Sequence, residues 1–194
     1  MSRLGDGSEP TILVCYGSSE GQTATVARRM RTVLENEGHD VTLVDAAARP
    51  ADLEVGSFDG VIVGASIHGG THQRSVAEFA HANADVLNRT ASAFFSVSLT
   101  AARETSDQRA SARDLLEGFL ETTGWDPDAT LVVAGALKYS QYGRLKRLLM
   151  RWIAGRPTGD TDTSRDYEYT DWAEVESFAS EFATLLESPT GSTG

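Results

Sequence analysis

The chain has 194 residues, enough for one domain with a continuous core, and its 40% apolar content is ordinary for a globular protein. The formal net charge of −11 argues against nucleic-acid binding, and the single cysteine, Cys15, excludes an internal disulfide or a cysteine-based metal site within one chain. The first ten residues lack an apolar secretory signal, and no run approaches the ~18 apolar residues of a membrane span, so we expect a cytoplasmic protein without a metal site.

Strand-like and helix-like segments alternate along the chain. Short apolar runs rich in β-branched residues indicate strands, and apolar residues three and four apart indicate the buried face of a helix. Strands are predicted over Thr11–Tyr16, Val41–Asp45, Phe58–Ala65, Ala93–Val97 and Leu131–Ala136, and helices over Thr23–Glu37, His72–Leu87, Ser106–Thr122 and Trp172–Leu186. Cys15 falls in the first strand and is interpreted as a small buried core residue.

This alternation predicts one α/β domain. Repeated strand–helix units favour an open, doubly wound parallel sheet with helices on both faces and right-handed crossovers. We expect the domain to span residues 11–187, with disordered tails at 1–10 and 188–194. No internal repeat or second domain is visible.

The junction after the first strand predicts a phosphate site. Glycines let backbone N–H groups turn inward, hydroxyls add donors, and the positive end of the following helix points to the same place. Neither a Walker lysine nor the G-x-G-x-x-G spacing is present, which leaves a mononucleotide phosphate. The alternative is an ordinary turn that caps a helix. The residues concerned are Gly17, Ser18, Ser19, Glu20, Gly21, Gln22 and Thr23.

Two further junctions are expected at the same edge of the sheet. Ligands of doubly wound sheets lie beyond the carboxyl ends of the strands, where the strand order reverses. Small, polar segments there can lay backbone amides along a flat heterocycle such as a flavin. The predicted contacts are Ala65, Ser66, Ile67 and His68 after the third strand, and Ser96, Val97, Ser98 and Leu99 after the fourth.

Several motifs together resemble a known family. Ser18-x-Glu20-Gly21-x-Thr23 resembles the flavodoxin phosphate signature, with Glu20 in place of its usual central threonine. The whole chain from Thr11 to Leu186 resembles the flavodoxin-like, FMN-dependent protoporphyrinogen IX dehydrogenases, which pass electrons to a quinone in haem synthesis. The matching segments are Glu20-Gly21-Gln22-Thr23, Val63-Gly64-Ala65-Ser66-Ile67, Ser92-Ala93-Phe94-Phe95-Ser96-Val97, Ala134-Gly135-Ala136-Leu137-Lys138-Tyr139, Thr161-Asp162-Thr163 and Tyr169-Thr170-Asp171-Trp172.

The resemblance implies a fold and a function. It implies a five-stranded sheet in the order 2-1-3-4-5, an FMN cofactor, protoporphyrinogen IX as substrate and a quinone as electron acceptor. It also implies an insertion before the last helix, here residues 138–171, which in the family is implicated in activity and in contact with the membrane quinone.

The insertion contains most of a basic segment, residues 129–159, which has several lysines and arginines and no Asp or Glu. Within it, residues 142–154 have the pattern of an amphipathic helix with a basic stripe. Such a helix suits peripheral membrane contact, binding of porphyrin carboxylates, simple packing on the domain, or a homodimer face. The predicted substrate or membrane contacts are Lys138, Tyr139, Arg144, Arg147, Arg151 and Trp152.

One departure from the family pattern bears on the substrate. The junction after the third strand reads His68-Gly69-Gly70, where familiar members of the family have a basic residue followed by an aromatic one. His68 is a candidate donor to the flavin or to a propionate, or else an exposed loop residue, whereas His72 is interpreted as structural or solvated. The alternative functions are a flavodoxin-like electron carrier and an NAD(P)H:quinone reductase, and no pyridine-nucleotide motif supports the latter.

Overall fold

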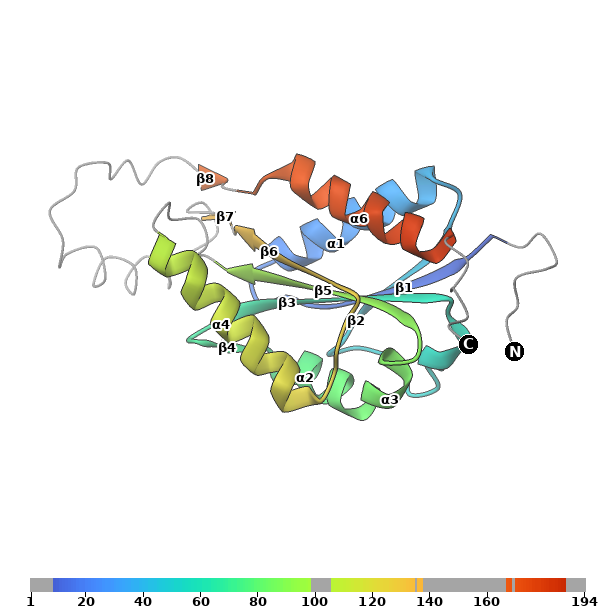
Figure 1. The fold of residues 1–194 in the computed structure, drawn as a ribbon, viewed down its shortest axis with the longest axis horizontal. Coiled ribbons are helices and arrows are strands. Elements are labelled where there is room, and N and C mark those ends of the chain that lie inside the picture. The colour runs from blue at the N-terminus through green and yellow to red at the C-terminus, as the bar shows by residue number, and fades with distance from the viewer. Residues whose placement is uncertain (1–8, 99–105, 135, 138–166, 169, 188–194) are drawn as a thin grey trace, which may run out of the picture.

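A computed structural model describes residues 9–98, 106–134, 136–137, 167–168 and 170–187 (Figure 1). Strands and helices alternate over most of this length, as the apolar periodicity predicts. The strands are β1 (Thr11–Gly17), β2 (Asp40–Asp45), β3 (Gly60–His68), β4 (Thr71–His72), β5 (Ala91–Ser98), β6 (Ala129–Ala134), β7 (Ala136–Leu137) and β8 (Tyr167–Glu168). The helices are α1 (Gln22–Asn36), the short 3-10 turn η1 (Val55–Ser57), α2 (Arg74–Ala82), α3 (Ala84–Leu87), α4 (Ser106–Thr123) and α6 (Trp172–Glu187).

The five long strands form a parallel sheet in the order β2-β1-β3-β5-β6. Counted without the short β4, this is the predicted order 2-1-3-4-5. The order reverses at β1, which is flanked by β2 on one side and β3 on the other. The carboxyl ends of β1, β3 and β5 therefore lie side by side, and the loops that follow them meet at one edge.

Helices α1 and α6 lie on one face of the sheet and α2, α3 and α4 on the other (Figure 1), and an apolar cluster fills each face. The first contains Val26 and Met30 of α1 with Phe178 and Phe182 of α6. The second contains Phe79 of α2 and Phe119 of α4 and includes the buried Cys15. Side chains alternate between these clusters along β1, β3 and β5, so both faces of each strand are apolar, as buried parallel strands require.

Three element boundaries differ from the sequence prediction. β3 continues to His68 and turns back into β4 through Gly69 and Gly70, whose φ angles of 61° and 83° suit a two-residue hairpin. The predicted helix 72–87 therefore begins only at Arg74. It also breaks at Asn83, whose side-chain amide donates to the carbonyl of Phe79 at 2.8 Å and so competes with the helix.

The segment after β6 also differs from the prediction. The predicted strand 131–136 ends at Ala134, and Ala136–Leu137 instead pairs antiparallel with β8 in a separate two-stranded sheet. The helix predicted over 142–154 lies outside the described residues. Within the described part of the chain, no helix is both long and apolar enough to cross a membrane.

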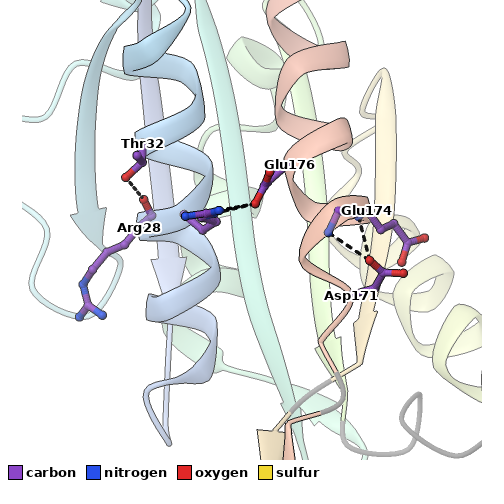
Figure 2. Close-up of polar contacts among 7 residues, drawn as sticks. Arg28, Thr32, Asp171, Glu174 and Glu176 are labelled. Carbon is purple, nitrogen blue, oxygen red and sulfur yellow. Dashed lines mark hydrogen bonds and ion pairs between the residues drawn. The ribbon is translucent and has the colours of Figure 1, made fainter.

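Helices α1 and α6 lie next to each other on one face of the sheet (Figure 2). Arg29 of α1 donates to the carboxylate of Glu176 at 2.8 Å. Asp171 accepts the N–H groups of Ala173 and Glu174 at 3.1 and 3.2 Å, which caps the start of α6. The chain that leads into α6 is therefore fixed close to the first helix.

Candidate functional site

The first turn of α1 has no side-chain cap among the described residues. Gly21 precedes the helix with φ 86°. Thr25 is the first residue whose N–H bonds back into the turn, to the carbonyl of Gly21 at 3.0 Å. The hydroxyl of Ser18 accepts the N–H of Gly21 at 2.9 Å, which fixes the loop. Within the described part of the chain, the N–H groups of residues 22–24 are consequently free donors at the positive end of the helix.

Two buried side-chain atoms in this turn lack a partner. Thr23 is only 1% exposed and Gln22 only 7%. Among the described residues, neither the hydroxyl oxygen of Thr23 nor Oε1 of Gln22 has a hydrogen-bond partner. A buried polar atom without a partner costs about 1–3 kcal/mol, so its presence at an open helix start indicates a place for a ligand.

Gln22 also connects the site to the chain leading into α6. Its Nε2 donates to the hydroxyl of Thr170 at 2.9 Å, and that hydroxyl donates to the carbonyl of Ala134 at 2.9 Å. Ala134 ends β6, and Thr170 directly precedes the residue that caps α6. One side of the site is therefore fixed to the end of the sheet.

Gln73 holds the other side of the site. Its Nε2 donates to the hydroxyl of Ser19 at 3.1 Å and also to the hydroxyl of Ser66. Its Oε1 accepts the N–H of Ser66 at 2.8 Å. A Cβ added to Gly17 would lie 2.5 Å from Val76, so α2 packs directly against the end of β1. The loop after β1 and the end of β3 are thus joined through α2.

An acidic and a basic side chain face each other at the rim. His68 Nδ1 lies 4.0 Å from the carboxylate of Glu20, and the His68 side chain is 63% exposed. A carboxylate within an anion-binding loop repels the anion, and a protonated His68 would reduce that repulsion. The Glu20 side chain is half-buried, but solvent reaches the pair from the His68 side and screens it, so its contribution is small.

His72 is a half-buried histidine beneath the same edge. Its ring lies 4.8 Å from the ring of Phe119 and 5.5 Å from that of Phe94, and its Nε2 is 2.9 Å from the hydroxyl of Ser96. Burial lowers the pKa of His72 from 6.5 to about 4. His72 is therefore structural, one of the two interpretations made from the sequence.

The structure brings together part of the predicted cofactor set. Residues 17–23 form the open turn. Gln73 connects Ser66 to this turn through hydrogen bonds, and His68 lies next to Glu20 of the turn. Ser66, Ile67 and His68 lie in a strand rather than in a loop, and both the N–H and the hydroxyl of Ser66 are engaged by Gln73. Ala65 is buried in the core.

The side chains at the end of β5 are buried. Ser96, Val97 and Ser98 are buried, and the Ser96 hydroxyl bonds to His72 rather than facing the edge. Several predicted contacts lie outside the described residues, namely Leu99, Lys138, Tyr139, Arg144, Arg147, Arg151 and Trp152.

Sequence reasoning missed Gln73 and Thr170. Gln73 falls inside the helix predicted over residues 72–87, and no sequence pattern indicates that its side chain connects two loops. Thr170 stands in the Tyr169-Thr170-Asp171-Trp172 segment, which was quoted as a family match without any role. Its contact with Gln22 spans 148 residues of sequence, and no local pattern reveals a contact of that range.

The arrangement suits a phosphate ester, and the one cysteine of the chain offers no reactive thiol there. Free N–H groups and the Thr23 hydroxyl are donors that a phosphate dianion accepts without help from lysine or arginine. Cys15 lies in the core, where burial raises the pKa of its thiol to about 12. The arrangement is therefore suited to holding a group that brings its own chemistry.

Comparison with known proteins places the chain in a class of protein. The chain belongs to the flavodoxin family, because the family model described as a flavodoxin domain matches residues 13–164. Solved structures show the same fold. A flavodoxin from Streptococcus pneumoniae TIGR4 superposes with a TM-score of 0.56 at 16% identity, covering 90% of this chain and 99% of that one. An oxidised flavodoxin from Bacillus cereus superposes with a TM-score of 0.55 at 17% identity, covering 90% and 97%.

The particular relatives are protoporphyrinogen IX dehydrogenases [quinone]. The enzyme of that name from Escherichia coli K12 is 34% identical over 180 residues, which cover 92% of this chain and 97% of that protein. The enzyme from Leishmania major is 32% identical over 176 residues, covering 91% and 76%. The chain is homologous to these enzymes over nearly its whole length, which confirms the resemblance found in the sequence.

Proposed function

We propose that this protein binds FMN with the phosphate at the open turn of α1. The observation that carries the proposal is the hydroxyl of Thr23, which is buried and without a partner among the described residues beside the free N–H groups of the same turn. FMN has one phosphate, and the loop offers donors for one phosphate and no lysine for a second. The homology to quinone-coupled dehydrogenases supports a redox cofactor at this place.

With FMN bound, we propose that the protein oxidises protoporphyrinogen IX to protoporphyrin IX and passes the electrons to a quinone. The substrate loses six hydrogen atoms, so three quinone molecules are each reduced to a quinol. The flavin supplies two-electron redox chemistry, and the chain positions it. The role of the chain is to hold the phosphate through residues 18–24 and to fix the surrounding loops through Gln73 and Thr170.

The segment 138–166 carries the remaining part of the proposal. Its arginines and Trp152 would contact the porphyrin carboxylates or a membrane surface that holds the quinone. We propose that the protein acts in the cytoplasm, in peripheral contact with the membrane.

An anaerobic turnover assay tests the proposed activity. Purified protein loaded with FMN receives protoporphyrinogen IX and a menaquinone analogue, and porphyrin fluorescence is followed. We expect fluorescence to rise faster than in a control with flavin-free protein, and to stop when quinone is omitted. A rate equal to that of the control would contradict the enzyme function and favour an electron carrier.

A further inference from the structure

The carboxamide of Gln22 can be oriented from its contacts. The oxygen and nitrogen of a glutamine side chain have similar shapes, so the hydrogen-bond network decides which is which. Nε2 of Gln22 lies against the hydroxyl of Thr170, and that hydroxyl also contacts the carbonyl of Ala134. A hydroxyl has one hydrogen, and the carbonyl of Ala134 can only accept it.

The Thr170 hydroxyl must therefore accept a hydrogen bond from Gln22. If the carboxamide were reversed, its oxygen would face a hydroxyl whose hydrogen is already donated to Ala134, and one buried bond would be lost. Thr170 thus fixes Nε2 toward the end of β6 and leaves Oε1 as the free atom. Oε1 is a pure acceptor, is buried, and has no partner among the described residues.

We infer that Thr170 is a positioning residue that makes Gln22 present an acceptor to a hydroxyl group of the ligand, next to the phosphate held by Thr23. A phosphate dianion cannot satisfy Oε1, because it offers only acceptors. A polyhydroxyl chain beside the phosphate supplies the missing donor. The inference rests on the proposed FMN site, whose phosphate is joined to such a chain.

The inference separates two recognition tasks within one helical turn. Thr23 and the free N–H groups recognise the phosphate, whereas Gln22 recognises a neutral donor and is set by a residue 148 positions away in the sequence. Thr170 directly precedes Asp171, the cap of α6, and follows the short β8 strand. The C-terminal end of the insertion thus orients a side chain of the cofactor site.

The test compares three probes, namely FMN, riboflavin and inorganic phosphate. Riboflavin has the hydroxyl chain without the phosphate, and inorganic phosphate has the reverse. We expect Thr170→Val to weaken binding of FMN and riboflavin by about fivefold each, the effect of one neutral hydrogen bond, and to leave competition by phosphate unchanged. Thr170→Ser keeps the hydroxyl and should bind both flavins as the wild type does.

A double-mutant cycle shows whether Thr170 acts through Gln22. In a Gln22→Met background, Thr170→Val should weaken flavin binding no further. Equal losses with and without Gln22, an unchanged affinity in Thr170→Val, or an equal loss of phosphate binding would each overturn the inference. If Thr170→Val does not fold, Thr170→Ala removes the same hydroxyl and replaces it in the cycle. A wild-type protein that binds no FMN would instead overturn the proposed function.

Discussion

The two ends of α1 differ in how their backbone groups are satisfied. Both are flanked by a glycine with positive φ, Gly21 at 86° and Gly38 at 93°. At the C-terminal end, Gly38 and His39 donate their N–H groups to the carbonyls of Glu35 and Leu34, so the end is closed by local backbone bonds. At the N-terminal end no side chain among the described residues caps the helix.

Unpartnered atoms alone do not distinguish the two ends. His39, next to the closed end, also has two buried ring nitrogens without a partner among the described residues. What is specific to the N-terminal end is the combination of free N–H groups, a helix dipole of positive sign and an unpartnered hydroxyl. The comparison teaches that the same residue type can close a helix at one end and leave the backbone donors open at the other.

Matched substitutions at the two glycines should show the largest difference between the two ends of α1. Valine is strained at positive φ, and a Cβ meets nothing within 4 Å at either position, so Gly21→Val and Gly38→Val introduce the same kind of backbone strain. Both variants should lose about 1–2 kcal/mol of stability. Gly21→Val alone should lose FMN, by at least about 100-fold in Kd, since its N–H groups rotate out of place.

The measurements for this pair are thermal unfolding and titration of flavin fluorescence. Normal FMN affinity in Gly21→Val, or an equal loss of affinity in Gly38→Val, would contradict the assignment of the open end as the site.

Replacing the Thr23 hydroxyl should have the next largest effect. Thr23→Val should weaken FMN binding by about 10- to 100-fold, because a hydrogen bond to a charged group contributes about 1.5–3 kcal/mol. The same variant should be as stable as the wild-type apoprotein or more so, by up to about 1 kcal/mol, since a buried hydroxyl without a partner is removed.

Thr123→Val is the matched control for that substitution. Thr123 is buried, and its hydroxyl donates to the carbonyl of Phe119 at 2.9 Å. This variant should lose about 1 kcal/mol of stability and keep its FMN affinity. A Thr23→Val protein that behaves like Thr123→Val in urea unfolding would show that the Thr23 hydroxyl is not reserved for a ligand.

The pH dependence of the free energy of unfolding should depend on His72, which lies at neither end of α1. Because the pKa of His72 is lowered to about 4 in the folded state, only the unfolded state binds this proton between about pH 6.5 and 4. The contribution of His72 is therefore complete above pH 6.5 and is lost as the pH falls toward 4, by on the order of 3 kcal/mol.

Urea unfolding of His72→Gln at several pH values measures this contribution. The variant should have a flatter stability profile between pH 6.5 and 4.5 than His81→Gln, which changes an exposed histidine of α2. Identical profiles in the two variants would contradict a half-buried neutral His72.

The sheet and the open turn at the start of α1 could be predicted from the sequence because both have local patterns. Apolar runs and helical spacing identify β1, α1 and β5, and the glycine and hydroxyl cluster after β1 identifies the open turn. The ties between loops were not predictable in this way. Gln73 acts only because β3 turns back through Gly69 and Gly70, and Thr170 acts on Gln22 only after the sheet has formed. Such contacts depend on tertiary packing, which no short motif reports.

The most direct test of the central claim compares the affinities of wild-type protein for FMN and riboflavin. The two ligands differ only in the phosphate, so the ratio of their Kd values measures what the open turn contributes. We predict that FMN binds at least about 100-fold more tightly, as expected for a dianion held by several charge-assisted hydrogen bonds, and that Thr23→Val reduces this ratio. Equal affinities for FMN and riboflavin would contradict the account.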